Sequence, residues 1–252
     1  MKRFLLLFAV FVVSLSAYYS PAEAVVHVEG RYWFTKLDSE IQVTEGATIG
    51  SEVDALNTLG VDDTENFWEA RLSLELGNHK FRYSYMPLLW EGQKNITNSI
   101  NFAGKTYTAD ANVESSLEIR YHRLGYRYDI VDRLNNQFGI IFDVKLLDVD
   151  AHLRAKTIDV DKSYSATIPL PTIGFGAQIG LPFSFSLGAE VTGVAYGGGN
   201  YLVDGEASLN FNPVSFASIS GGYRVFDVQV KNKDDKIDFT LKGPFVMVRV
   251  GF

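Results

Sequence analysis

Apolar and polar residues alternate along most of the chain after residue 24, with the two-residue period of a β-strand whose faces meet different surroundings. The clearest case is residues 68–76, where Trp68, Leu72 and Leu76 share one face and charged or serine side chains occupy the other. The alternation is found in residues 26–34, 68–76, 81–85, 117–128, 138–146, 173–181, 185–191, 201–211, 217–225 and 237–252. The pattern therefore predicts an all-β chain of about ten strands.

The apolar pattern changes phase in two of these stretches. In residues 117–128 the apolar positions are odd-numbered up to Tyr121 and even-numbered from Leu124 onward. One extra residue in a strand has this effect, so we predict a β-bulge near Arg123. A similar slip is predicted near Pro244 in the last stretch.

The connections alternate between short and long. Short links are expected at residues 77–79, 131–136, 182–183 and 212–213, and longer ones at 36–65, 88–114, 150–165, 197–200 and 231–236. Such alternation is typical of a transmembrane antiparallel up-and-down β-barrel with short periplasmic turns and longer extracellular loops. Twelve strands result if the hairpin at residues 101–107 also spans, and eight if weak stretches merge; we predict ten.

Aromatic residues gather at both ends of the predicted strands, as bilayer interfaces favour. At the short-turn end they are Phe81, Tyr126, Tyr128, Phe138, Phe185, Phe211, Phe216 and Phe252; at the other end they are Trp68, Tyr85, Trp90, Tyr201 and Phe226.

The final strand places Val246, Val248, Val250 and the terminal Phe252 on one face. In this feature the sequence resembles the bacterial outer-membrane β-barrels, the superfamily of small porin-like and OmpA-type barrels. The resemblance implies location in the bacterial outer membrane with both termini in the periplasm. It also implies three partners: outer-membrane lipid, lipopolysaccharide, and the insertion machinery that reads the strand ending in Phe252.

The N-terminal residues have the features of a secretory signal peptide. Lys2 and Arg3 precede an apolar run at residues 4–13, and Ala22-Glu23-Ala24 supplies a small-residue cleavage site. The run is too short for a membrane-spanning helix. We therefore predict a cleaved signal peptide at residues 1–24 and a barrel domain at residues 25–252.

Composition narrows the chemistry. The chain has no cysteine, which excludes disulfides, thiol catalysis and Cys-ligated metals. Its net charge of −7 argues against a nucleic-acid partner. His27, His79 and His122 lack metal-ligand spacing, so no metal site and no cofactor are predicted.

If the apolar rows face lipid, the opposite rows face the lumen. The charged residues predicted there are Glu29, Arg31, Glu69, Arg71, Glu75, Arg82, Glu118, Arg120, Arg127, Asp129, Asp143, Lys145, Glu190, Asp204, Glu206, Arg224 and Arg249. Acids and bases nearly balance, and a ten-stranded lumen is narrow. One interpretation is an ion-pair network that closes the lumen, with a structural or surface role for the protein. The other is a narrow pore for small solutes.

An enzyme is the alternative from a different class. Ten strands also resemble the omptin proteases, whose outer rim carries an Asp-x-His pair facing a second acidic pair. Asp150-Ala151-His152 matches the first pair, with Asp148 one step below, and Asp62-Asp63 could supply the second. The resemblance implies that His152 acts as a base for water. The simpler interpretation is a hydrated rim of ordinary polar residues without catalysis.

Overall fold

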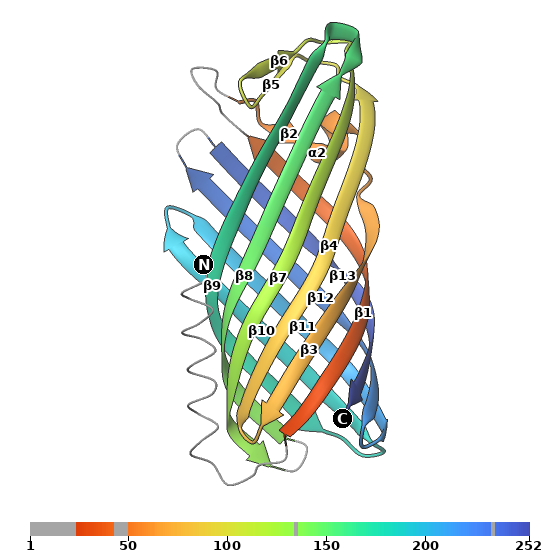
Figure 1. The fold of residues 1–252 in the computed structure, drawn as a ribbon, viewed down its shortest axis with the longest axis vertical. Helices are drawn as coiled ribbons and strands as arrows, with labels where there is room; N and C mark the ends of the chain where they lie inside the picture. Colours follow the sequence, from red (N-terminus) through yellow and green to blue (C-terminus); the bar gives the residue numbers. More distant parts are fainter. Residues whose placement is uncertain (1–23, 43–49, 134–135, 233–234) are drawn as a thin grey trace.

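The computed structural model describes residues 24–42, 50–133, 136–232 and 235–252, which form a closed antiparallel barrel (Figure 1). The predicted signal peptide lies outside the described residues except for Ala24, and its cleavage stays a prediction.

Ten strands form the barrel wall, and each pairs with the next along the chain. They are β1 (Ala24–Gln42), β3 (Thr64–Leu76), β4 (His79–Asn95), β7 (Asn112–Arg133), β8 (Asn136–Ala155), β9 (Val160–Gly180), β10 (Phe185–Gly197), β11 (Asn200–Val214), β12 (Ala217–Asn232) and β13 (Asp235–Gly251). Pairing of β13 with β1 closes the ring. The predicted fold class and strand number are confirmed.

Five short elements lie outside this wall, all at the end of the barrel where the longer connections are found. They are β2 (Val53–Asp54), α2 (Ala55–Leu59), β5 (Ile100–Phe102), β6 (Lys105–Tyr107) and the 3₁₀ turn η1 (Lys156–Ile158). Strands β5 and β6 pair only with each other, so the hairpin near residues 101–107 adds no strands to the ring. Within the described residues, no helix has the length and apolar character needed to cross a membrane.

We call the end with the short connections the turn end and the opposite end the loop end. Chain segments 77–78, 181–184 and 215–216 connect strands at the turn end, where Arg133 of β7 also pairs with Asn136 of β8 and where the C-terminus lies (Figure 1). The β11–β12 turn falls at residues 215–216, two residues beyond the predicted Asn212-Pro213. The β11–β12 ladder is irregular between Phe211 and Val214, which accommodates Pro213 without ending the strand.

The two predicted phase slips are absent. In β7 the inward-facing row consists of odd-numbered residues from Val113 to Asp129, and the irregularity falls between Asp129 and Val131 instead of near Arg123. In β13 the odd-numbered row runs unbroken past Pro244. From the turn end to the loop end of these strands the apolar residues move from the outer face to the inner face, while the strand itself continues without an extra residue at the two predicted positions.

The two faces exchange polarity part-way up the barrel. In β1, Val28 and Tyr32 are exposed on the outer face near the turn end, whereas Asp38 occupies that face near the loop end. The inner face changes in the opposite sense, from Arg31 to Leu37. The same exchange occurs on the other long strands at the height of Trp33, Phe67, Tyr121, Leu147 and Phe226, which we call the crossover level.

The crossover also corrects the predicted aromatic belt at the loop end. Trp90 and Phe226 point inward and are 0% and 5% exposed, so neither lies on the outer surface. Trp68 and Tyr223 are exposed on the outer face close to this level. The sequence prediction failed because it assumed that apolar residues face outward over the whole length of every strand.

Candidate functional site

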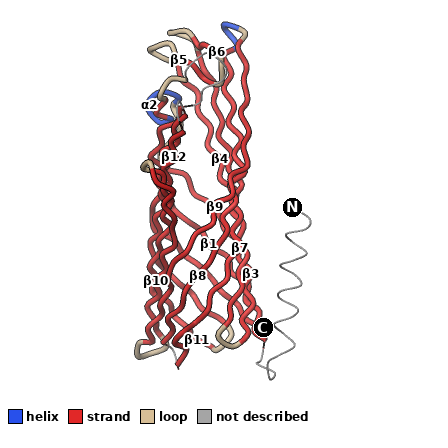
Figure 2. The backbone as a smooth tube through the Cα atoms, turned by 90° about the vertical axis from the view of Figure 1, so that its left-hand side faces the viewer, coloured by secondary structure: helices blue, strands red, loops and turns tan. Residues whose placement is uncertain are grey.

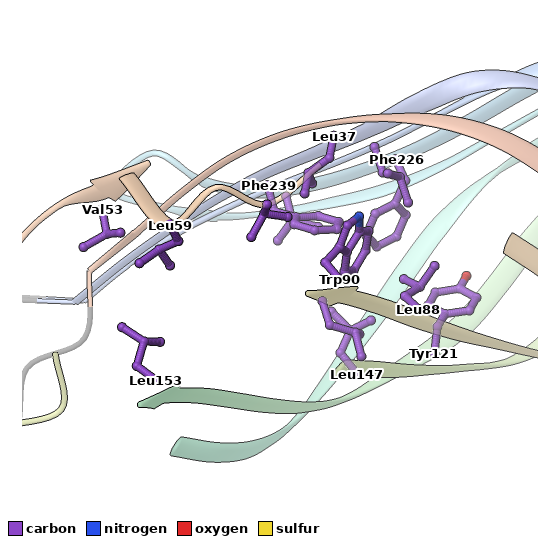
Figure 3. Packing of buried hydrophobic residues seen from close by; sticks show 14 of the residues in the cluster. Leu37, Val53, Leu59, Leu88, Trp90, Tyr121, Leu147, Leu153, Phe226 and Phe239 are labelled. Atoms are coloured by element: carbon purple, nitrogen blue, oxygen red, sulfur yellow. The ribbon is translucent and has the colours of Figure 1, made fainter. Parts of the chain in front are cut away.

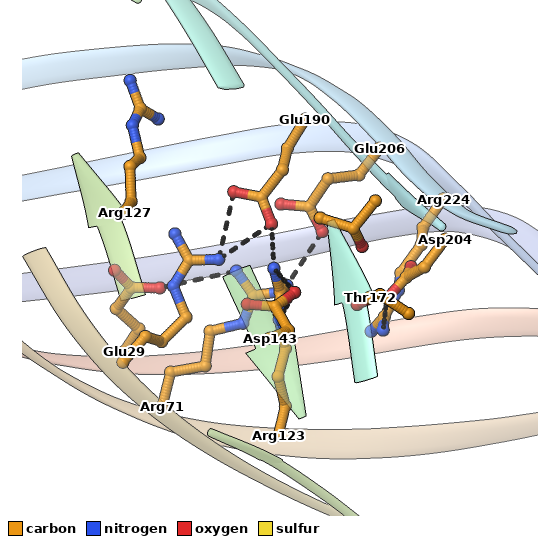
Figure 4. A network of polar contacts seen from close by, with 12 residues as sticks. Glu29, Arg71, Arg123, Arg127, Asp143, Thr172, Glu190, Asp204, Glu206 and Arg224 are labelled. Atoms are coloured by element: carbon orange, nitrogen blue, oxygen red, sulfur yellow. Dashed lines mark hydrogen bonds and ion pairs between the residues drawn. The ribbon is translucent and has the colours of Figure 1, made fainter. Parts of the chain in front are cut away.

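The interior on the turn-end side of the crossover level contains a continuous network of ion pairs (Figure 4). Its acids include Glu29, Glu69, Asp143, Glu190, Asp204 and Glu206, and its bases include Arg31, Arg71, Arg82, Arg123, Lys145, Arg224 and Arg249. All lie on inward-facing rows, because alternation along each strand sends every second side chain into the lumen.

Glu69 is the centre of one half of the network. Its Oε1 accepts a hydrogen bond from Arg71 Nε at 2.7 Å, and its Oε2 lies 3.1 Å from Arg224 Nη1 and 3.4 Å from Arg31 Nη1. Glu206 is on β11, and its Oε2 lies 2.8 Å from Arg31 Nη2 and 3.1 Å from Arg71 Nη2. These bonds join β1 and β3 to β11 and β12 across the lumen.

The second half of the network surrounds Lys145, whose side chain is fully buried. Its Nζ donates to Thr192 Oγ1 at 2.6 Å and to Thr172 Oγ1 at 3.2 Å, and lies 3.3 Å from Asp143 Oδ2. Arg123 also binds Asp143, at 2.6 Å, and reaches Glu190 on β10. Buried charges are tolerated only when they are paired in this way.

Aromatic rings cover the network from above. The guanidinium of Arg224 lies over the rings of Trp33 and Tyr121, with centroid distances of 4.9 and 5.6 Å. The guanidinium of Arg31 lies 4.0 Å from the centroid of Phe245. Delocalised cations pack well against aromatic faces, so these rings join the polar layer to the apolar layer above it without a gap.

Below the network, at the turn end, is a polar vestibule of about 660 Å³, its opening to solvent included. Its walls include Gln178, Ser208, Asn210 and Ser220, and its roof is formed by Arg71 and other members of the network. The vestibule therefore ends at the ion pairs.

The loop-end half of the interior is apolar (Figure 3). Trp90 packs edge-on against Phe67 and Phe239, at centroid distances of 4.9 and 5.7 Å, and is 0% exposed. Next to this cluster is a chamber of about 870 Å³, its open mouth included. Its lining consists of aliphatic, Met, Phe and Tyr side chains from β1, β4, β7, β8, β9, β12 and β13. We call it the apolar chamber.

The rim residues suggested by the protease resemblance are not brought together. On β8, Asp148, Asp150 and His152 share the outer face, since the inward row of this strand is odd-numbered. Asp150 binds Arg120 at 2.8 Å and accepts a hydrogen bond from Ser165 at 2.6 Å.

His152 Nε2 lies 2.7 Å from Oδ1 of Asp161 on β9. This carboxylate was not among the residues predicted from the sequence. Asp148 accepts from Thr167, and Asp63 lies 3.5 Å from Lys36 beside β1. The suggested acids are therefore engaged in separate surface pairs and do not face His152.

No protein-family model matches the sequence, and no curated protein sequence matches it significantly. Solved structures with a similar fold include the outer membrane protease OmpT from Escherichia coli, at a TM-score of 0.59 and 8% identity. The match covers 90% of this chain and 97% of OmpT. The chain has the fold of the outer-membrane β-barrels.

The translocator domain of the autotransporter NalP from Neisseria meningitidis also matches, at a TM-score of 0.48 and 9% identity, covering 99% of this chain and 95% of that domain. At such low identities the likeness is one of fold alone.

In this outer-membrane barrel fold, most of the charges predicted for the lumen lie on inward rows. They are Glu69, Arg71, Glu75, Arg82, Arg127, Asp143, Lys145, Glu190, Asp204, Glu206, Arg224 and Arg249, together with Glu29, Arg31 and Asp129. Glu118 and Arg120 are corrections: they lie on the outer face of β7 with side chains nearly half exposed. Arg123 was missed, because the predicted bulge removed it from the inward row.

Proposed function

We propose that this chain is an outer-membrane barrel that does not conduct solutes and serves a structural or surface role. Its membrane placement is supported by an apolar belt on the outer face between the turn end and the crossover level. The belt includes Val28, Leu72, Phe142, Ile173, Phe175, Leu187, Val191, Leu209, Ile219, Val246 and Val248. A patch that encircles a protein in this way is not stable in water and suits lipid.

The single observation that carries the closed state is the ion-pair network. Arg31, Glu69 and Arg224 have side chains no more than 1% exposed, although they point into the lumen of a ring of only ten strands. An ion passing this layer would have to separate buried pairs, which costs several kcal/mol or more. In the proposed orientation the turn end is periplasmic and the loop end is extracellular.

The test is conductance of the purified protein in a planar bilayer. The wild type is expected to give no discrete openings. The double variant Arg71→Ala/Glu206→Ala removes an opposed charge pair at the roof of the vestibule and is expected to give small openings. Arg120→Ala/Asp150→Ala removes a similar pair on the outer wall and is expected to stay silent. Discrete openings of the wild type would establish the pore and end the closed-barrel proposal.

The implied partners remain part of this proposal. The backbone of Phe252 exchanges two hydrogen bonds with Val26, at 2.8 and 3.1 Å, so the end of the chain is part of the closed barrel. The phenyl side chain of Phe252 stays exposed, where insertion machinery could contact it. Lys36 and Lys242 are cross-strand neighbours on the outer face just beyond the belt, where phosphates of lipopolysaccharide would lie.

A further inference from the structure

Strand β9 leaves its neighbour at the crossover level. The β9–β10 ladder runs from Gly180 to Ile173 and ends there, opposite Gly193. Beyond that rung, residues 160–172 of β9 stay paired with β8 alone. Figure 2 shows the upper part of β9 standing apart from the wall that contains β12. We call this separation the seam.

The early end of β10 at Gly197 and two prolines on β9 keep the seam from closing. Pro169 and Pro171 have the same parity on β9, and the β8–β9 ladder runs through both without interruption. Because proline lacks an N–H, the missing donors must fall on the edge that faces away from β8. The seam edge therefore cannot form a regular ladder with β10.

The apolar chamber lies directly behind the seam. Its lining comes from β9 on one side, with Ile168 and Leu170, and from β12 on the other, with Val228 and Val230. Among the residues that line it in the described structure, none belongs to β10 or β11. Tyr164 lies on the inward row of β9 yet is 37% exposed, since no strand covers it there. The chamber thus opens sideways through the seam.

The mouth of the chamber meets the apolar belt. Ile173 forms the last β9–β10 rung and Val191 lies two rungs below it; both are on the outer face, 55% and 49% exposed. Beyond Ile173 the outer face of β9 continues with Pro171, and the neighbouring Leu170 lines the chamber. The inward residues at the end of the ladder, Thr172 and Thr192, have their hydroxyls engaged by Lys145. A chain lying against the belt can therefore reach the chamber past Ile173 and Pro171.

We propose that the apolar chamber binds one hydrocarbon chain of an outer-leaflet lipid, which enters through the seam while the lipid's head group stays outside. The lining offers dispersion contacts and Tyr hydroxyls only at its margins, so it suits a linear aliphatic chain and no charged group. Because the mouth of the chamber adjoins the belt, we expect the bound hydrocarbon chain to come from a lipid of the bilayer and not from a solute in the medium. The inference rests on the membrane placement proposed above.

Fluorescence quenching by brominated lipid tests this site. The chain has three tryptophans, of which Trp68 faces outward while Trp33 and Trp90 face inward. In a Trp68→Phe background the emission comes from the interior, and Trp90 contacts Phe239 of the chamber wall. The protein is reconstituted in phosphatidylcholine vesicles with and without bromine at the middle of the acyl chains.

The expected result is strong quenching in the Trp68→Phe protein. Adding Ala151→Phe, which fills the chamber, is expected to restore emission almost to that in unbrominated vesicles. Adding Ala189→Phe, which places the same bulk on the outer face, is expected to leave the quenching unchanged. Leu170→Asn gives a second variant, because it makes the chamber polar and keeps a side chain branched at the same carbon.

Three outcomes overturn the inference: no interior quenching, quenching that both chamber variants leave intact, or quenching only when brominated fatty acid is added to unbrominated vesicles. Quenching of Trp68, obtained as the difference between the wild type and the Trp68→Phe protein, separates this failure from that of the membrane placement. Trp68 quenched with the interior unquenched rejects the chain-binding site alone. Trp68 unquenched rejects the membrane placement as well.

Discussion

Three guanidinium groups share the two carboxylate oxygens of Glu69, so this side chain holds together cations from three strands. Glu69→Gln keeps the shape and removes the charge, leaving Arg31, Arg71 and Arg224 short of a counter-ion inside the barrel. Loss of one partner from a buried ion pair typically costs about 3–5 kcal/mol, which we expect here.

Urea titration of the protein in vesicles measures this cost. Glu118→Gln on the outer face is the matched control, and an exposed pair of this kind is expected to change the free energy of unfolding by less than about 1 kcal/mol. Equal effects of the two variants would contradict the role given to Glu69.

Residue by residue, the sequence located charges where the strand phase was unambiguous. Asp143 and Lys145 lie between apolar neighbours on a clean alternation and are found inside as expected. Arg123 was lost because the apolar row changed sides at that point. Ion-pair partners such as Glu190 for Arg123 depend on which strands face each other across the lumen, and alternation carries no information about that distance.

At the scale of elements, the β5–β6 hairpin is attached to the wall through Tyr107, which is buried and donates a hydrogen bond to the carbonyl of Leu153 at 2.8 Å. Burial, with a smaller contribution from Asp161, raises the pKa of Tyr107 from 10.0 to about 12. A raised phenol pKa means that the folded state favours the neutral ring. The stabilisation from Tyr107 is therefore complete below pH 10 and is lost as the pH rises to about 12.

The difference in tyrosinate absorbance between wild type and Tyr107→Phe follows this group through an alkaline titration. A transition near 12 is expected, and the variant should lose about 1 kcal/mol of hairpin docking at neutral pH. A transition at the ordinary value of an exposed phenol would show that the hairpin is not docked through this ring.

Strand β9 provides an internal comparison for the seam. Residues 173–178 have ladder partners on both sides, whereas residues 160–172 have them on one side. Backbone amides without a partner exchange with solvent far faster than paired ones. Hydrogen exchange by mass spectrometry is expected to show fast exchange in 160–168 and slow exchange in 173–178. Uniform protection along the strand would mean that the edge of residues 160–172 is paired and that the seam is closed.

For the whole molecule, the exchange of polarity at the crossover level explains both what the sequence revealed and what it concealed. Alternation predicted ten strands, their order and the closed ring, because period two survives whichever face is apolar. It predicted two phase slips, near Arg123 and Pro244, that the structure does not have. The reason is that the apolar residues move from odd to even positions both at a β-bulge and where the inner and outer faces exchange polarity. The extent of the strands beyond the apolar belt was hidden for the same reason.

The belt itself can be tested with two substitutions on one strand and one face. Leu72 lies in the middle of the belt and is 51% exposed, whereas Asn66 lies beyond Trp68 toward the loop end. Leu72→Arg is expected to cost about 2–4 kcal/mol in a folding titration into vesicles, and Asn66→Arg about 0–1 kcal/mol. Equal costs would place the belt outside the bilayer.

The prolines at the seam also bear on how this protein behaves among its neighbours. An unpaired strand edge can form a β-ladder with a strand of another polypeptide, and such edges meet often in a crowded membrane. Pro169 and Pro171 interrupt that template without blocking the space beside it. The barrel can thus keep a side entrance open and still remain separate from other copies of itself.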